Sequence, residues 1–219
     1  MTSLTTHTKA AQSGKPDSMV IFLHGYGADG QDLLGLADPL APHLPDTVFL
    51  SPDAPNTCSV NPMGYEWFPI PWLDGSPAEL AELGMREAVA KLNTWLDEMA
   101  VEHGVSADRT VLVGFSQGTM MSLHVAPRRT DALAGVVGFS GRLLNPEDLA
   151  KEAVNKPPVM LIHGDADDVV PYDDMAKAAN GLATAGFEVY THTSKGTAHG
   201  IAPDGLSMAL QFIKKVLGE

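Results

Sequence analysis

Six short apolar segments rich in β-branched residues recur along the chain, separated by stretches with helical character. They are MVIFL (19–23), TVFL (47–50), TVLVGF (110–115), AGVVGF (134–139), PVMLI (158–162) and FEVYTH (187–192). Several are apolar at every position, which is typical of strands buried on both faces of a sheet. Their alternation with helices predicts an α/β fold, in which a mostly parallel central sheet carries helices on both faces.

Helix signals stand between these segments. The longest helix is expected from about Pro77 to His103, with Ser76 as its N-cap and Glu79 closing a capping box. Three further helices are expected: after Asn145 and Pro146, from near Tyr172 to Gly186, and from about Pro203 to Leu217.

No linker or charge block divides the 219 residues, so we expect a single domain over residues 1–219. Residues 1–16 are expected to be flexible or to form an edge strand. Residues 52–76 form a loop too long for a simple connection, and long loops over the carboxyl ends of strands commonly shape pockets. We therefore expect this loop to line a substrate pocket.

Composition and charge narrow the class of protein. No apolar run approaches the ~20 residues that cross a bilayer. The polar first 18 residues and the single cysteine, Cys58, favour a cytoplasmic protein without internal disulfides. A net charge of −13 with scattered basic residues argues against nucleic-acid binding and stable membrane association.

The tripeptide GFS occurs twice and raises the question of a reactive serine: in GFSQG at Gly114–Gly118 and in GFSGR at Gly138–Arg142. Gly-x-Ser-x-Gly between a strand and a helix is the form of a turn that exposes a nucleophilic serine. Ser116 has a strand before it and a helical stretch after it. Ser140 is followed by Arg142, where the second small residue should stand, so Ser116 is the expected nucleophile and Ser140 a polar residue at a strand end.

A serine nucleophile of this architecture needs an acid and then a histidine later in the chain. Three acids follow the strand PVMLI, namely Asp165, Asp167 and Asp168, and the residue pattern alone does not choose among them. His192 lies in a strand-like alternation, whereas His199 lies in the small-residue turn GTAHGI. His199 is therefore the favoured base.

A rival interpretation is dinucleotide binding. Gly25, Gly27 and Gly30 satisfy Gly-x-Gly-x-x-Gly after a strand, and Asp53 follows about 20 residues on. Gly35 and Pro39 weaken the helix that this motif requires, and the interpretation leaves the motifs GFSQG, HGDADDVVP and GTAHGI unexplained.

A metal site at His163, Asp165, Asp167 and Asp168 is also disfavoured, because a calcium loop would need glycine at Val170 and glutamate at Ala176. We expect no cofactor and no metal, and His163 to be a structural residue.

The motifs HGYGADGQDL, GFSQG, HGDADDVVP and GTAHGI together resemble the phospholipase/carboxylesterase family of α/β-hydrolases over nearly the whole chain. The resemblance implies the α/β-hydrolase fold, Asp167 as the acid and His199 as the base. It also implies an oxyanion hole formed by the backbone N–H groups of Tyr26 and Gln117.

In the resembled family the long loop helps to line the acyl site, which points to Met63, Trp67, Phe68 and Trp72 as substrate-pocket residues. The chain departs from the family at Pro69, where an aspartate is usual, and at Thr119, where a small residue is common. We expect both departures to affect which acyl chains the protein prefers more than they affect the catalytic reaction.

The sequence thus predicts a serine carboxylesterase that acts on a small-molecule ester or thioester. The alternative within the class is an acyl-protein thioesterase or lysophospholipase for long acyl chains. A non-catalytic binding module on the same scaffold is a third interpretation, disfavoured because no triad member is missing. The sequence leaves monomer and homodimer equally open.

Overall fold

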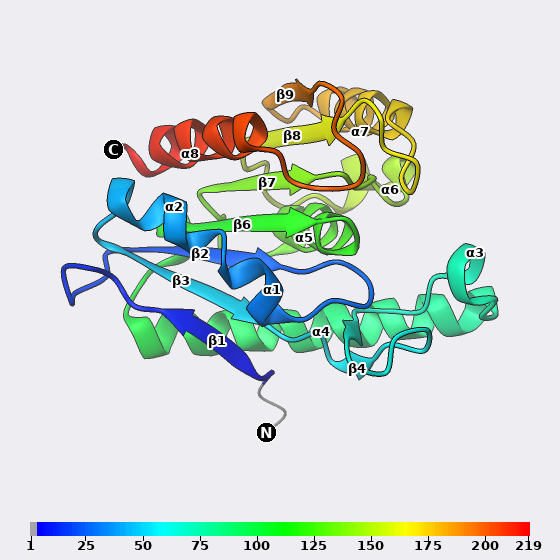
Figure 1. Ribbon diagram of the computed structural model, residues 1–219, viewed down its shortest axis with the longest axis horizontal. Helices are drawn as coiled ribbons and strands as arrows, with labels where there is room; N and C mark the ends of the chain where they lie inside the picture. Colours follow the sequence, from blue (N-terminus) through cyan, green and yellow to red (C-terminus); the bar gives the residue numbers. More distant parts are fainter. Residues whose placement is uncertain (1–3) are drawn as a thin grey trace.

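The computed structural model describes residues 4–219, and a seven-stranded sheet runs through it in the order β1-β3-β2-β6-β7-β8-β9 (Figure 1). Its strands are β1 Thr6–Lys9, β2 Ser18–Leu23, β3 Thr47–Pro52, β6 Thr110–Phe115, β7 Gly135–Phe139, β8 Val159–Gly164 and β9 Val189–Ser194. The six predicted strands are all confirmed, and their pairs are parallel. The additional strand β1 lies at the edge, antiparallel to β3.

Helices cover both faces of the sheet. The helices are α1 Gly30–Leu34, α2 Ala37–Leu40, α4 Ala78–His103, α5 Gln117–Arg128, α6 Pro146–Glu152, α7 Asp173–Thr184 and α8 Pro203–Leu217. Buried residues of α1, α2 and α8 share one apolar cluster, and those of α4 to α7 share the other. The sheet is therefore the middle layer of three, as the apolar runs predicted.

Strand β2 shows why its sequence is apolar throughout. Met19 and Ile21 belong to the cluster under α4 to α7, whereas Val20 and Phe22 belong to the cluster on the opposite face. All six residues of β2 are buried. Because side chains alternate across a strand, a sheet covered on both faces needs apolar residues at consecutive positions.

The start of α4 differs from the prediction. The helix begins at Ala78, Pro77 is its N-cap, and no side chain caps it. The Ser76 hydroxyl is buried and has no hydrogen-bond partner among residues 4–219, while the Ser76 N–H donates to Asp74 Oδ1. The predicted capping box of Ser76 and Glu79 is therefore wrong, because Asp74 holds the backbone before the helix in another conformation.

The six parallel strands β3, β2, β6, β7, β8 and β9 end at the same edge of the sheet, where the long loop after β3 also lies (Figure 1). This loop contains a small antiparallel pair, β4 Asn56–Thr57 with β5 Tyr65–Glu66, and the short helix α3 Pro71–Asp74. Ligands bind at this edge in open α/β sheets. No helix in the described part of the chain is long and apolar enough to cross a bilayer.

His124 of α5 gives the fold a dependence on pH. Burial, and next the Arg128 cation, lower the pKa of His124 to about 4, although Glu152 acts in the opposite direction. Between pH 6.5 and about 4 the unfolded chain therefore binds a proton at this residue that the folded chain does not. The contribution of neutral His124 to the free energy of unfolding is therefore fully present above pH 6.5 and is lost as the pH falls toward about 4.

We expect the melting temperature of wild-type protein to fall more steeply from pH 6.5 to 4 than that of His124→Gln. The difference should correspond to about one proton taken up on unfolding. The matched control is His43→Gln, because His43 is exposed. Equal slopes for wild type and His124→Gln would show that the folded protein does not hold His124 neutral in this pH range.

Candidate active site

Ser116 joins β6 to α5 in a strained turn. Its backbone has φ 54° and ψ −113°, in a region that non-glycine residues rarely adopt. The Ser116 N–H donates to Phe139 O at 2.9 Å, which ties the turn to the neighbouring strand β7. This geometry turns the side chain away from both strand and helix.

The two glycines that flank Ser116 allow this turn. A Cβ atom at Gly114 would lie 2.4 Å from the carbonyl carbon of Gly118, and one at Gly118 would lie 1.8 Å from Leu23 O. Both distances are far inside van der Waals contact with backbone that cannot easily move. The close approach of β6, α5 and β2 therefore requires glycine at both positions.

We expect Gly118→Ala to lower the free energy of unfolding by ~3 kcal/mol or more, because its methyl group would overlap backbone atoms of β2. Chemical denaturation followed by circular dichroism measures the change. The matched control is Gly35→Ala, where φ is −56° and the nearest atom to the new Cβ would be 3.7 Å away. That change should be neutral or stabilising by less than ~1 kcal/mol, and equal losses in both variants would contradict the account of the turn.

The second tripeptide, around Ser140, serves packing. Ser140 also has positive φ, but it is 1% exposed and no helix begins until Pro146. A Cβ atom at Gly138 would lie 2.6 Å from Thr119 Cγ2, and one at Gly141 would lie 2.4 Å from Thr119 Cβ. The glycines of GFSGR thus make room for Thr119, which explains why a larger residue follows GFSQG in this chain.

The three residues expected to form a triad come together at the carboxyl ends of their strands. His199 Nε2 lies 3.1 Å from Ser116 Oγ, and His199 Nδ1 lies 2.8 Å from Asp167 Oδ2. The Phe115 ring packs against the His199 ring, with centroids 4.9 Å apart. Asp165 instead accepts from Gly196 N, and Asp168 is exposed, so Asp167 is the acid that faces the histidine.

Both carboxylate oxygens of Asp167 accept hydrogen bonds. Its side chain is fully buried, and Oδ1 accepts hydrogen bonds from the N–H groups of Val169 and Val170, each at 2.9 Å. Burial acts to raise the pKa of Asp167, but the hydrogen bonds from His199 and the two backbone groups outweigh it. The pKa of this carboxyl therefore lies below its ordinary value, and the group is ionised at neutral pH.

The acid and histidine loops are bound to each other. A Cβ atom at Gly164 would lie 2.1 Å from Thr197 O, so the two loops approach as closely as glycine permits. Ala166 N donates to Thr197 O at 3.1 Å, and Gly196 N donates to Asp165 Oδ1 at 2.6 Å. These contacts fix the separation of Asp167 and His199 before any ligand binds.

The turn after β2, residues 24–30, lies against Ser116. A Cβ atom at Gly25 would be 3.3 Å from Ser116 Cβ. The next N–H along the chain is that of Tyr26, and the first N–H of α5 is that of Gln117. In the part of the chain that the structure describes, neither N–H donates to another protein atom. Both are therefore available as donors near the Ser116 hydroxyl.

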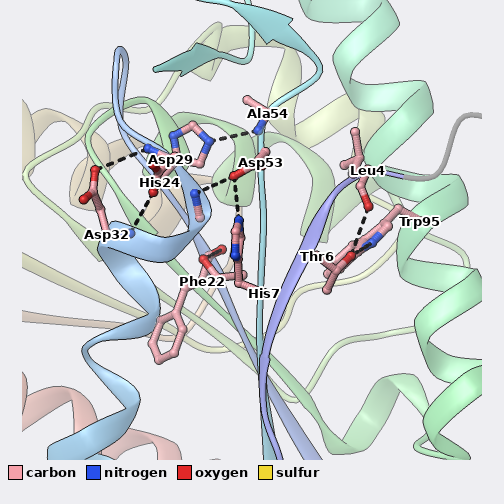
Figure 2. Close-up of polar contacts among 12 residues, drawn as sticks. Leu4, Thr6, His7, Phe22, His24, Asp29, Asp32, Asp53, Ala54 and Trp95 are labelled. Atoms are coloured by element: carbon pink, nitrogen blue, oxygen red, sulfur yellow. Dashed lines mark hydrogen bonds and ion pairs between the residues drawn. The ribbon is translucent and has the colours of Figure 1, made fainter. Parts of the chain in front are cut away.

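His24 fixes the start of this turn. Burial is the main cause that lowers the pKa of His24, so the ring is neutral. Its Nδ1–H donates to Gly25 O at 2.8 Å. Its Nε2 accepts from Ala54 N at 2.9 Å, as Figure 2 shows. Because Gly25 C=O and Tyr26 N–H belong to one planar peptide, holding the carbonyl fixes the direction of the N–H.

Asp53 fixes the other end of the same turn. Its Oδ1 accepts from Gly30 N at 2.9 Å and lies 3.0 Å from His7 Nε2 of β1 (Figure 2). A Cβ atom at Gly30 would lie 2.4 Å from Ser51 O. The glycine pattern and Asp53 therefore serve packing against β3, and α1 has only five residues, so the dinucleotide interpretation loses its acidic residue and its helix.

The Gln117 side chain has a role that the sequence did not reveal. Its Oε1 accepts from Trp67 N at 2.9 Å, and its Nε2 donates to Phe68 O at 2.7 Å, all buried. Trp67 Nε1 donates to His24 O at 3.0 Å. Gln117 thus binds the long loop, which Trp67 in turn joins to the turn of residues 24–30.

The predicted pocket residues divide into two pairs. Trp67 and Phe68 are 0% and 5% exposed, because they anchor the loop in the core, and they offer little surface to a ligand. Met63 and Trp72 are 86% and 57% exposed. The Arg142 guanidinium lies 4.9 Å from the centre of the Trp72 ring and also pairs with Asp174 at 2.8 Å, so α3 is drawn toward the loop after β7.

No group of three or more histidine, cysteine or acidic side chains within residues 4–219 is arranged to hold a metal ion. Of the suspected cluster, Asp167 faces His199 and His163, and Asp165 accepts from Gly196 N. Each of these groups thus already has a protein partner.

The sheet order, the strained Ser116 turn and the later acid and histidine define an α/β-hydrolase fold. A family model described as Phospholipase/Carboxylesterase matches residues 7–217. The chain therefore belongs to the phospholipase/carboxylesterase family, as the motifs predicted.

Similar proteins agree with this membership. An acyl-protein thioesterase 1 from Gibberella zeae is 31% identical over 212 residues, covering 90% of each chain. The crystal structure of esterase PE8 is 40% identical with a TM-score of 0.92 and covers 98% of this chain and 100% of its own. Arabidopsis thaliana SOBER1 is 25% identical with a TM-score of 0.78, covering 91% of this chain and 99% of its own.

Proposed function

We propose that the protein is a serine carboxylesterase that hydrolyses small-molecule carboxylic esters through a covalent acyl-enzyme. The observation that carries the proposal is the continuous contact from Ser116 Oγ to His199, 3.1 Å, and from His199 to Asp167, 2.8 Å. Family membership and the likeness to esterase PE8 support the same chemistry.

The reaction assigns a role to each residue. His199 Nε2 takes the proton of Ser116 Oγ as that oxygen attacks the ester carbonyl carbon, and Asp167 stabilises the resulting imidazolium. The negative charge that develops on the carbonyl oxygen is stabilised by the N–H groups of Tyr26 and Gln117, each such donor being worth ~3 kcal/mol in hydrolases. His199 then protonates the leaving alcohol as the acyl-enzyme forms.

Hydrolysis of the acyl-enzyme repeats these steps with water. His199 accepts a proton from a water molecule that attacks the acyl carbon, and the same proton passes to Ser116 Oγ as the acid leaves. The balance requires only ester and water, and the residues named use no cofactor.

The acyl group is the point on which substrates of this family can differ. A thioester offers the same carbonyl to Ser116, and the Gibberella zeae relative is named an acyl-protein thioesterase, so thioesters of long acyl chains are the second candidate. We favour small neutral esters because the net charge of −13 repels anionic membrane surfaces.

The single, buried Cys58 supports a cytoplasmic location.

The test is kcat/KM across p-nitrophenyl esters from acetate to palmitate, with Ser116→Ala as the blank. We expect a maximum below eight carbons. A maximum at eight carbons or beyond, with each added methylene contributing up to ~0.8 kcal/mol, would favour the long-chain candidate. Activity equal to the blank at every chain length would contradict the esterase proposal.

A further inference from the structure

Thr119, in the first turn of α5, is buried more deeply than a residue that contacts substrate would be. A small residue is common at this position in the family, and acyl preference was the expected effect of the difference. Thr119 is, however, 1% exposed. Gly138 and Gly141 enclose it, since a Cβ atom at either position would lie less than 3 Å from its side chain. Direct contact with an acyl chain therefore does not explain this residue.

The Thr119 hydroxyl contacts two backbone carbonyl groups on either side of the nucleophile turn. Its Oγ1 donates to Phe139 O at 2.7 Å and to Gly114 O at 2.9 Å, so one hydrogen is shared between two oxygens. The two carbonyl groups belong to β6 and β7, which are neighbours in the sheet. The hydroxyl thus joins α5 to both strands at the point where Ser116 forms the turn.

Thr119 is also connected to both backbone polar groups of Ser116. The Ser116 N–H donates at 2.9 Å to Phe139 O, the same oxygen that accepts from the Thr119 hydroxyl. The Thr119 N–H donates to Ser116 O at 3.0 Å. A carbonyl oxygen has two lone pairs, so Phe139 O can accept both hydrogens. The contacts form a closed ring of hydrogen bonds through Ser116, Phe139 and Thr119.

We propose that Thr119 is a positioning residue for the nucleophile, because its hydroxyl holds the carbonyl group to which the Ser116 N–H is bound. The inference rests on the proposed function of Ser116. The backbone of Ser116 has φ 54°, and a non-glycine residue keeps such a conformation only where surrounding contacts determine it. The ring supplies these contacts, and it fixes Ser116 Oγ relative to His199 Nε2, which lies 3.1 Å away.

Thr119→Val tests the hydroxyl, since valine has nearly the same shape as threonine. A valine methyl group would stand where Oγ1 lies, 2.7 Å from Phe139 O and 2.9 Å from Gly114 O. A carbon atom approaches a carbonyl oxygen only to about 3.3 Å, so both carbonyl groups must move, and Ser116 moves with Phe139 O. Misplacing a reacting group by about 1 Å can cost about 100-fold in rate, so a shift of about half that distance should cost about tenfold.

The experiment measures kcat and KM for p-nitrophenyl acetate, butyrate and decanoate in wild type, Thr119→Val and Thr119→Ser. In Thr119→Val we expect kcat to fall about tenfold for every ester, with the order of preference among the esters unchanged. Thr119→Ser keeps the hydroxyl, so its kcat should stay within about threefold of wild type. A kcat of Thr119→Val equal to wild type would overturn the inference. A loss that depends on chain length would also overturn it, in favour of acyl preference.

Thr110→Val is the matched control, because it makes the same change at the other end of β6. Thr110 is 2% exposed, and its hydroxyl donates to Ser106 O at 3.0 Å. Its melting temperature should fall by a similar amount, because one buried hydrogen bond is lost in each variant. Its kcat should nevertheless equal that of wild type. An equal loss of kcat in both valine variants would show that destabilisation alone explains the result, and would overturn the inference.

Hydrogen exchange of the Ser116 amide, followed by NMR, gives a readout that needs no turnover. We expect exchange to be about tenfold faster in Thr119→Val than in wild type, since Phe139 O is displaced. An unchanged exchange rate would overturn the inference. A folded wild-type protein without esterase activity would instead contradict the proposed function, and the exchange rates would still test the ring. If Thr119→Val does not fold, Thr119→Ala removes the hydroxyl without adding a methyl group, and exchange as slow as in Thr119→Ser would overturn the inference.

Discussion

Replacing Ser116 with alanine is expected to lower kcat by about 10⁴- to 10⁶-fold while the protein stays folded. The hydroxyl is the only part removed, and it lies 3.1 Å from His199 Nε2, the proposed base, on a turn whose strain Gly114 and Gly118 accommodate. The melting temperature should not fall, because alanine keeps the same backbone hydrogen bonds and the same Cβ contacts as serine. Steady-state hydrolysis of p-nitrophenyl acetate measures the change.

Ser140→Ala is the matched control for this prediction. Ser140 follows the same Gly-Phe pair and also has positive φ, but its hydroxyl is buried and has no hydrogen-bond partner among residues 4–219. We expect its kcat to stay within a few-fold of wild type. Full activity in Ser116→Ala together with an inactive Ser140→Ala would reverse the assignment of the nucleophile.

Asp167→Asn is the second large effect, an expected loss of about 10⁴-fold in kcat at neutral pH. The amide removes the charge that stabilises the His199 imidazolium. It also brings an N–H₂ group into a position surrounded by donors: two backbone N–H groups and His199. One of these contacts must become a clash between donors, so His199 also loses its orientation.

Asp165→Asn and Asp168→Asn are the controls, since both residues are exposed acids of the same loop. Each should keep kcat within a few-fold of wild type, with the pH profile unchanged. A loss in Asp165→Asn as large as that in Asp167→Asn would show that the acid is misassigned. Circular dichroism at the assay temperature separates loss of chemistry from loss of fold.

The fold was largely predictable from the sequence because its strands are buried on both faces. Continuous apolar runs such as that of β2 have no other stable place than the middle of a three-layer structure. The edge strand β1 was harder, since Thr6 to Lys9 are polar and only half-covered. The start of α4 was predicted wrongly, because the hydrogen bond from Ser76 N to Asp74 competes with the capping that local sequence favours.

The candidate site was predictable where a residue type has a distinctive local pattern. Gly114 and Gly118 marked Ser116, because the turn leaves no room for a Cβ atom two residues before or two residues after it. The choice of Asp167 among three acids came from the family resemblance, since only the folded chain shows which one faces His199. Trp67 was expected in the pocket, yet an aromatic residue that lines a pocket and one that anchors its wall look alike in sequence.

The role of the Gln117 side chain could not be predicted from the sequence. The amide of Gln117 binds Trp67 and Phe68, about 50 residues away in the sequence, along directions that only the fold defines. Gln117 stands inside the motif GFSQG, whose glycines and serine form the pattern that is recognised. Long-range hydrogen bonds of this kind lie outside what periodicity and spacing can predict.

Covalent labelling with a fluorophosphonate, followed by peptide mapping by mass spectrometry, tests the central claim most directly, since the reagent marks a serine that a base has activated. We expect one adduct per chain, on the peptide that carries Ser116, and at least a hundredfold slower labelling in His199→Ala by the loss of general-base catalysis. An adduct on the Ser140 peptide, or ester hydrolysis by a protein that takes up no label, would contradict the assignment of Ser116 as the nucleophile.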